Sequence, residues 1–536
     1  MAKGIEIPQV PPEQQTPLVG ELLALIERLA QRIQEQDERI EQLKDEVAVL
    51  KGEKKRPQFK PSRLDPGTTP KEAPSQSESG KRPGSAKRAK TAQLVIDEER
   101  IVAPSEPIPT GSRFKGYRDV VVQELIIRSH TIRYRLARWL TPDGRTLIGR
   151  LPESLGRRHF GPTLASYVLY QHHHCHVTQP LLREQLREWG VDISVGQLDA
   201  LLSADKDAFH QEKDALLDAG LAVSDYVTVD DTGARHRGRN GYTTHIGNDF
   251  FAWYASTAAK SRINFLELLR AGHTDYRIDA QALTSMQAQG LAQALRQRLR
   301  DHPQRHFADV SQWEAHLEAL DIRGERHRRI ATEGALLASA IEHGLAPDLV
   351  VVSDDAGQFD VLRHGLCWVH AERLIHKLIP LNDAHRQDIA AVRSQIWSLY
   401  ADLKAYKTGP SPAQAAALRA RFKDIFTQKT RFATLNQTLD RIHRNRDELL
   451  LVLDCPNIPL HTNGSETDIR DYVKKKKVSG GTRSDLGRQC RDTFTSLKKT
   501  CRKLGISFWK YLHDRHSNIG DIPPLSDLIR QRASPG

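Results

Sequence analysis

The sequence predicts a multidomain α/β protein with a separate helical region at its N-terminal end. Three observations predict this fold class: a heptad repeat near the N-terminus, a Pro/Ser/Lys-rich stretch after it, and β-rich runs that alternate with helical patterns in the rest of the chain. The 536 residues correspond to three or four structural units at roughly 150 residues each.

The composition limits the kind of binding partner and the cellular compartment that we expect for this protein. A formal net charge of +12 favours a polyanionic partner, which leaves nucleic acid and an anionic membrane surface both open. No apolar run approaches the ~20 residues of a membrane span, which excludes an integral membrane protein, and the N-terminus lacks the apolar core of a secretory signal. The five cysteines form no CxxC pair, so we expect a reducing, cytoplasmic location.

A heptad repeat runs from residue 19 to residue 50, and we predict a coiled coil over 18–51 after a short tail at 1–17. β-branched residues at position a with Leu at position d favour a parallel dimer, whereas a single amphipathic helix could also pack on its own globular body. The a positions are Val19, Ile26, Ile33, Ile40 and Val47, and the d positions are Leu22, Leu29, Gln36, Leu43 and Leu50.

The next segment, 52–93, is predicted to be a disordered basic linker. It is rich in Pro, Ser, Gly and Lys and has almost no large apolar residues, so it cannot form a core. Its excess of basic residues suits loose contact with phosphates, although a plain solvated linker would have a similar composition.

Two small units are predicted before the first acidic motif. Apolar and polar residues alternate around a Pro-Asp-Gly turn at 142–144, which predicts a β-rich module over 94–160. An amphipathic helix ending near Trp189, a break at Gly190 and an N-cap at Ser194 then outline a helix-turn-helix within 161–215, although any αα-hairpin looks similar. The histidines at 172–174 and 176 do not suit zinc, because adjacent helical residues point in different directions.

Two apolar β runs, at 226–229 and 349–352, each end in a pair of aspartates. α/β sheets expose their sites at the carboxyl ends of the strands, so the two pairs are expected at one edge of a sheet. The pairs are Asp230 with Asp231 and Asp354 with Asp355.

A third acid, Glu466, opens a helix in the sequence Asn-Gly-Ser-Glu. The spacing from Asn463 to Glu466 is also that of a capping box, so Glu466 alone could be a capping residue. Three carboxylates that converge from two strands and a helix suit hard divalent cations, and two such ions roughly 4 Å apart stabilise an in-line phosphoryl displacement.

The segments VDDTG, SDDAGQF and HTNGSETDIR resemble the three acidic blocks of DDE transposases of the insertion-sequence-66 type. Other features are similar to that family: the leucine-zipper segment, the basic linker, the helix-turn-helix, a CWxHA block at Cys367–Ala371 and a helical insertion before the Glu. The resemblance extends from about residue 18 to about residue 515.

The resemblance implies an RNase H-like core over 216–375 and 456–515, interrupted by a helical insertion at 376–455 and followed by a tail at 516–536. It implies that Asp230, Asp354 and Glu466 are the catalytic, metal-binding acids, with Mg²⁺ as cofactor and Mn²⁺ as a substitute, while Asp231 and Asp355 stay open as alternatives. Asn463, Arg470, Cys367 and His370 match family positions that support the site. Many relatives carry a Cys-rich zinc finger before the helix-turn-helix, but residues 131–151 contain no cysteine, so no zinc is expected.

Basic side chains near these acids are candidates for DNA contact. They lie in the loop between the first two core strands and in the basic stretch after Glu466, where they would neutralise phosphates without reading sequence. The candidates are Arg235, Arg237, Arg239, Lys474, Lys475, Lys476, Lys477, Arg483 and Arg488.

The resemblance thus implies a prokaryotic, nucleoid-associated transposase that binds the terminal inverted repeats of its own element, then cleaves and joins DNA. A homodimer formed through the coiled coil and accessory transposition proteins are the expected protein partners, and no membrane is involved. Two alternatives stay open: an RNase H-like metal nuclease without joining activity, and a catalytically silent DNA-binding regulator.

Overall fold

The computed structural model of the chain describes residues 94–152, 155 and 159–533, together with five residues near the N-terminus: Val19, Leu22, Leu25, Ile26 and Leu29. Those five residues are helical, but the rest of the predicted coiled coil, the tail at 1–17 and nearly all of the linker at 52–93 lie outside the described residues. Contacts divide the chain into one unit of residues 1–56, 133–188 and 192–536 and a second unit of 57–132 and 189–191.

The β-rich module predicted for 94–160 is reduced to one hairpin. Residues 94–132 form neither helix nor strand and are exposed almost throughout. The hairpin joins β1 (Arg138–Leu140) to β2 (Thr146–Ile148) around the predicted turn, where Gly144 has a φ of +80°. Alternating apolar residues were sufficient to predict strands here, but strands need a second layer on which to bury their apolar face.

The helices predicted for 161–215 form where the sequence places them. The order is α2 (Pro162–Leu169), the π-helical turn η2 (Tyr170–His174), α3 (Gln179–Glu188) and α4 (Val195–Ser203). Ser194 caps α4 in a full capping box: its Oγ accepts from the backbone N–H of Gln197 at 3.2 Å, and the Gln197 side chain accepts from the backbone N–H of Ser194 at 2.9 Å. Gly190 lies just after the end of α3 and adopts a φ of +80°, a backbone conformation that favours glycine.

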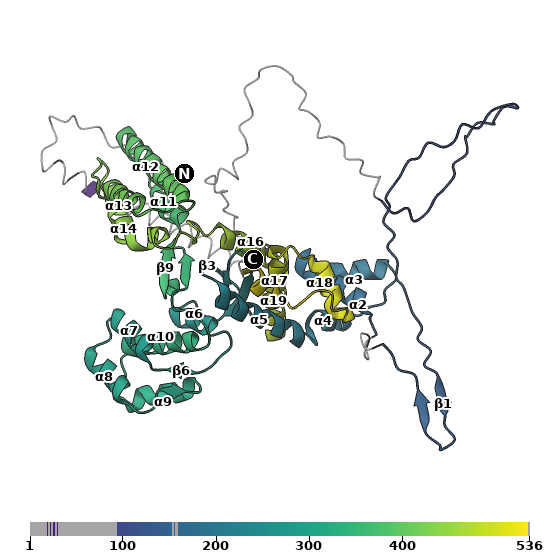
Figure 1. Cartoon of the computed structure of the whole chain (residues 1–536), viewed down its shortest axis with the longest axis horizontal. Helices are drawn as coiled ribbons and strands as arrows, with labels where there is room; N and C mark the ends of the chain where they lie inside the picture. The colour runs from purple at the N-terminus through teal and green to yellow at the C-terminus, as the bar shows by residue number, and fades with distance from the viewer. Residues whose placement is uncertain are drawn as a thin grey trace. The chain divides into compact units, whose positions relative to one another are not determined.

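A five-stranded mixed sheet forms the centre of the first unit, with the order β5-β4-β3-β8-β9 (Figure 1). β4 runs antiparallel to both β3 and β5, whereas β3, β8 and β9 run parallel. All four residues of β8 are buried, as expected for a strand covered on both faces. The strands are β3 (Tyr226–Gly233), β4 (Tyr242–Gly247), β5 (Ala252–Thr257), β8 (Val350–Ser353) and β9 (Arg363–Leu366).

Helices that precede the sheet in the sequence and helices that follow it both pack on this part of the fold. α16 (Asn463–Ser479) contacts β3 and β4, while α17 (Asp485–Lys503) packs on β5. α5 (Asp207–Val223) packs against α17, so segments far apart in the sequence share one layer.

A helical insertion that the sequence did not indicate separates β5 from β8. Its longest helix, α10, contacts α6, α7 and the short strand β6. Trp313 and Ala335 are buried within the insertion. The elements are α6 (Arg262–Leu269), β6 (Tyr276–Arg277), α7 (Ala280–Ala288), α8 (Gln293–Asp301), β7 (His306–Phe307), α9 (Val310–Ala319) and α10 (Glu325–Glu342).

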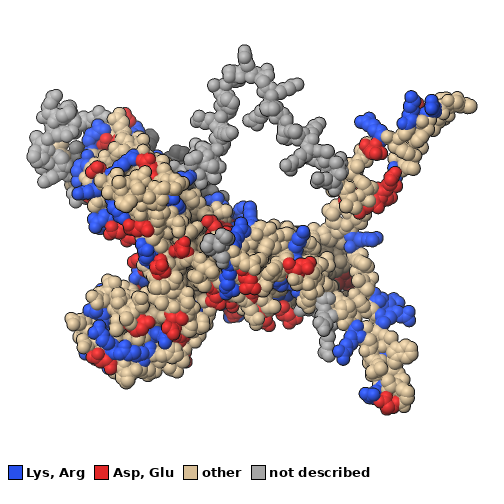
Figure 2. Space-filling model, in the orientation of Figure 1, with Lys and Arg blue, Asp and Glu red and all other residues tan. Residues whose placement is uncertain are grey.

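A second helical insertion occupies the region predicted for it, 376–455. It packs on the β8–β9 edge of the sheet, because Val350 and Leu366 share one apolar core with Trp368, Leu399 and Phe422. Figure 2 shows Lys and Arg interspersed with Asp and Glu on its surface. The elements are α11 (Trp368–His376), α12 (Asp383–Tyr406), α13 (Pro412–Thr427), α14 (Ala433–Arg444), α15 (Arg446–Leu449) and the 3₁₀ turn η4 (Leu451–Leu453).

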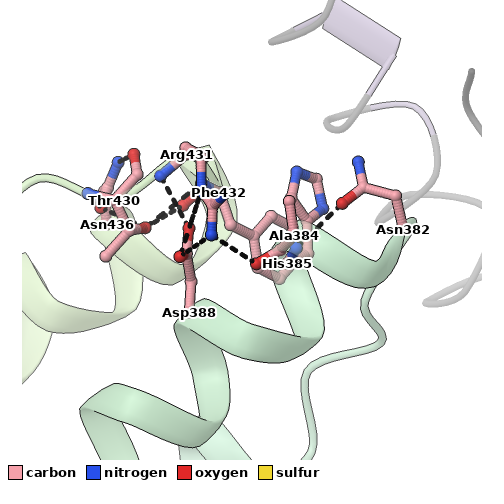
Figure 3. Close-up of polar contacts among 8 residues, drawn as sticks. All are labelled: Asn382, Ala384, His385, Asp388, Thr430, Arg431, Phe432 and Asn436. Carbon is pink, nitrogen blue, oxygen red and sulfur yellow. Dashed lines mark hydrogen bonds and ion pairs between the residues drawn. The ribbon is translucent and has the colours of Figure 1, made fainter. Parts of the chain in front are cut away.

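One ion pair ties the start of α12 to the loop before α14 (Figure 3). Arg431 Nη2 lies 2.6 Å from Asp388 Oδ1 and also donates to the carbonyl of Ala384, while the backbone N–H of Arg431 donates to Asp388 Oδ2 at 2.9 Å. Burial alone would raise the pKa of Asp388, but the bonds from Arg431 outweigh it and hold the pKa below its ordinary value.

The predicted tail at 516–536 is wrong for most of its length. After α18 (Phe508–Ser517), residues Leu525–Ala533 form α19, which packs on α5 with Leu525 and Ile529 fully buried. The apolar residues of this short helix were too few to stand out in the sequence. In the described part of the chain, no helix combines the length and apolar character needed to cross a membrane.

Candidate active site

The two aspartate pairs meet where β3 and β8 stop pairing. The parallel register places Tyr226 opposite Val350 and Thr228 opposite Val352. Asp230 and Asp354 each lie two residues beyond the last of these pairs. β3 does not end at its acidic pair as predicted; it continues to Gly233, paired with β4. The acids therefore lie at the point where the parallel ladder opens.

Asp230 lies among other carboxylates. Burial is the largest influence on it, followed by the charge of Asp354, and the charges of Asp231 and Glu466 also contribute. Together they raise the pKa of Asp230 to about 7. This electrostatic coupling indicates that acids from β3, from the end of β8 and from the start of α16 lie close together.

The side-chain direction along β3 distinguishes Asp230 from Asp231. Successive residues of a strand point to opposite faces, so Thr228, Asp230 and Thr232 share one face. Thr228 accepts a hydrogen bond from Ser465 Oγ of α16 at 2.5 Å, and Thr232 Oγ1 lies 3.4 Å from Lys476 Nζ at the other end of that helix. Asp230 therefore points towards α16, the helix that carries Glu466.

The second acid of each pair is bound by side chains from other elements. Asp231 Oδ2 accepts from Gln358 Nε2 at 2.6 Å, and its Oδ1 lies 3.5 Å from Lys260 Nζ. Asp355 is paired with Arg441 of α14 at 2.6 Å and accepts from Asn445. Asp231 and Asp355 are therefore engaged by side chains of other elements.

Glu466 lies in the first turn of α16 but does not form the capping box that its spacing allowed. The helix begins at Asn463, its N-cap is Thr462, and no side chain caps it. Glu466 Oε1 instead lies 3.6 Å from His370 Nε2 and 3.8 Å from Arg373 Nη2, both on α11. This oxygen is buried and has no hydrogen-bond partner, so it is available to a cation.

Cys367 and His370 form a small polar cluster behind Glu466. Burial alone would raise the pKa of Cys367, but the adjacent His370 outweighs burial, and the pKa is lowered. Burial alone would lower the pKa of His370, but Cys367 and Glu466 outweigh it, and the pKa is raised. The backbone N–H of Thr462, the residue before α16, donates to Cys367 Sγ at 3.4 Å. The pair thus connects α11 to the start of the Glu466 helix. Arg470, by contrast, lies exposed on the outer side of α16.

The basic loop between β3 and β4 docks on the segment between α16 and α17. Backbone hydrogen bonds join Arg237 N to Thr482 O at 2.8 Å and Thr482 N to Arg235 O at 3.0 Å. Gly481 is required for this approach, since a Cβ there would lie 2.5 Å from the Arg235 carbonyl oxygen. Two predicted DNA-binding segments are therefore adjacent.

The basic candidates do not all face solvent, and Lys475 does not fit the prediction. Its side chain is buried at 4 % exposure and donates to the backbone of His172, and burial lowers its pKa to about 7. Lys476 is half-buried and donates to the carbonyl of Gly233. Arg237 and Arg488 are paired with Asp485. The exposed candidates without an ion pair among the described contacts are Arg235, Arg239, Lys474 and Arg483, and Lys477 is exposed as well.

A buried ionic network that sequence reasoning missed holds α16 on α17. Asp468 lies 3.3 Å from Lys499 and 3.0 Å from Lys503, and Asp471 lies 2.6 Å from Lys498. His245 of β4 also faces Asp468, at 3.3 Å. The sequence signal was present: Asp468 and Asp471 lie three residues apart on one side of α16, opposite a Lys-rich helix.

A cavity of about 250 Å³ opens beside Asp354. Its apolar lining comes mainly from α11 and α14, and Arg373, Lys377 and Arg441 add positive charge. The second insertion thus contributes a basic wall next to the acids.

Two comparisons show what known proteins the chain is similar to. Residues 350–490, from β8 to the start of α17, match the model of the family described as Transposase IS66 family. The chain is also 45 % identical over 321 residues to an uncharacterized protein, y4jO, of Sinorhizobium fredii (strain NBRC 101917 / NGR234), an alignment that covers 59 % of this chain and all of that protein.

Proposed function

The chain belongs to the IS66 family of transposases, and from this premise we propose that it cleaves DNA at the ends of a mobile element and transfers the freed strand to a target. The observation that carries the proposal is that Asp230 and Asp354 follow the last paired residues of β3 and β8, next to the start of α16 that carries Glu466, while Asp231 and Asp355 contact other side chains. The mixed order β5-β4-β3-β8-β9 supports an RNase H-like core.

The residues present fit a pair of Mg²⁺ ions. Carboxylate oxygens are the ligands that Mg²⁺ prefers, and the raised pKa of Asp230 and the Glu466 oxygen that accepts no hydrogen bond are both compatible with an added cation. Asp230, Asp354 and Glu466 would hold the ions, for which Mn²⁺ could substitute. When bound, the ions would stabilise the attacking and leaving oxygens of the phosphodiester displacement.

The chain's own groups would orient these acids and the DNA. His370 and Arg373 would hold the Glu466 carboxylate, and the ionic network of Asp468 and Asp471 would fix α16 against the sheet. The exposed arginines of the basic loop, with Arg483 beside them, would neutralise backbone phosphates near the site.

The remaining parts of the chain would position the DNA ends. We propose that α3 and α4 act as a helix-turn-helix that reads bases in a major groove. The heptad repeat would pair two protomers, so that two ends are held together, and the working location would be the nucleoid. Accessory transposition proteins are further candidate partners.

Single substitutions test the acids directly. Asp230→Ala, Asp354→Ala and Glu466→Ala should each reduce cleavage of end-containing DNA by at least about 100-fold, because loss of a metal ligand should cost no less than loss of a residue that only supports a ligand. Binding of the same DNA should change little. The matched controls are Asp231→Ala and Asp355→Ala, each next to a proposed ligand, and they should keep most of the activity.

The outcomes separate the proposal from its alternatives. Cleavage that survives one of the three substitutions removes that residue from the site, and inactive controls with active triad variants would reverse the choice within the pairs. Pre-cut ends that are bound but never joined would indicate a nuclease without joining activity. Binding with no cleavage by the parent protein, in Mg²⁺ or Mn²⁺, would indicate a DNA-binding regulator.

A further inference from the structure

A cluster of imidazoles surrounds one carboxylate in the first insertion, away from the three acids. Within the described residues, His273, Asp275 and His343 are the one group of three His, Cys, Asp or Glu side chains whose potential ligand atoms all lie within 4.8 Å of one another. His343 Nε2 lies 2.7 Å from Asp275 Oδ1, and the rings of His273 and His343 lie parallel with their centroids 3.5 Å apart.

The carboxylate at the centre is held in place before any ion binds. Asp275 is 8 % exposed, and its Oδ1 accepts a hydrogen bond from Ser339 Oγ of α10 at 3.0 Å. Its Oδ2 is buried without a hydrogen-bond partner, and His306 Nε2 of β7 lies 3.4 Å from it. A third imidazole is therefore within reach of the same carboxylate.

The ligand chemistry selects the kind of ion. Imidazole nitrogens with one carboxylate suit a borderline transition ion such as Zn²⁺, whereas Mg²⁺ prefers oxygen ligands. Ligating carboxylates are usually hydrogen-bonded by a neighbouring group, and Ser339 fills that role here.

We infer that His273, Asp275 and His343 form a zinc site distinct from the three acids. No zinc is expected from the sequence, since residues 131–151 contain no cysteine. The ligands proposed here have no recognisable spacing: Asp275 and His343 are 68 residues apart, and only the fold brings them together. The first insertion as a whole was not indicated by the sequence either.

The site would join two parts of the first insertion. His273 and Asp275 lie in the segment before β6, and His343 is the C-cap of α10. Figure 1 shows α10 and β6 together in this insertion, and the chain runs from α10 directly into β8, the strand before Asp354. A bound ion would therefore fix the segment that leads into β8.

The test is zinc binding by the full-length protein, with excess Mg²⁺ present to keep hard-cation sites occupied. Metal content after dialysis should be one zinc per chain, Zn²⁺ should raise the melting temperature, and Co²⁺ should give visible d–d absorption bands. Asp275→Asn and the double variant His273→Ala/His343→Ala should lose this zinc, the temperature shift and the bands. His273 and His343 are exposed, so their replacement leaves the core intact.

Two further variants sharpen the result. Ser339→Ala keeps every ligand and removes the hydrogen bond to Asp275, so zinc affinity should fall by roughly 10- to 100-fold. His327→Ala, near the opposite end of α10, should bind zinc like the parent. Equal zinc content in the parent and the double variant would overturn the proposal, as would a parent protein that binds no zinc.

Discussion

The most informative single residue is Asp230, because its ionisation links the site to stability. Its pKa in the folded protein is about 7, above the ordinary value of 3.8. The folded state therefore binds more protons than the unfolded state between these values, and stability falls as the pH rises through about 4 to 7. Above that window, the charged carboxylate destabilises the metal-free fold.

Asp230→Asn should consequently stabilise the protein at pH 8 and have little effect near pH 4. A shift of about three pKa units corresponds to roughly 4 kcal/mol, which is an upper bound for the gain. Chemical denaturation in the presence of a chelator, at both pH values, measures it. Asp231→Asn serves as the control, and the same gain at both pH values would contradict this account.

At the scale of residues, the sequence was sufficient to propose three candidate acids but not to show how each aspartate pair divides its contacts. Acid pairs after two β runs, an acid at a helix start and the family resemblance together led to Asp230, Asp354 and Glu466. The partners that occupy Asp231 and Asp355 come from distant elements: Gln358 and Lys260 for the first, Arg441 for the second. No local pattern encodes such contacts, and the burial of Lys475 was hidden for the same reason.

At the scale of elements, the second insertion depends on the contact between Asp388 and Arg431. Arg431→Ala would leave a largely buried carboxylate on α12 without its partner, so we expect a loss of about 1–3 kcal/mol in the free energy of unfolding. Urea denaturation measures this loss. Arg386→Ala is the matched control, because its pair with Asp383 is exposed on the same helix and should contribute almost nothing. Equal losses in the two variants would show that the Asp388 contact is not special.

The elements that could be predicted are those with strong local signals. Ser194 as a cap and the apolar run of β8 gave correct positions for α4 and for a buried strand. The first insertion could not be separated from the core, because its short amphipathic helices resemble those of any α/β domain. The N-terminal β pattern was misleading, since alternation alone does not supply a partner sheet.

At the scale of the whole molecule, the heptad repeat predicts the oligomeric state. Deleting residues 1–51 should convert a dimer into a monomer, because nine of the ten a and d positions are apolar and only a partner helix would bury them. Sedimentation of the full-length and shortened proteins measures the change. A full-length protein that sediments as a monomer would favour the alternative, a helix that packs on its own globular body.

The sheet also has a consequence for synthesis of the chain. Thr228 and Ser465, which touch across the site, are 237 residues apart in the sequence, and both helical insertions lie between them. Contacts of such long range form late, and domains fold progressively as they leave the ribosome. A nascent chain that has already exposed β3 and β8 still lacks Glu466, so the proposed metal site cannot form until the ribosome has passed that residue.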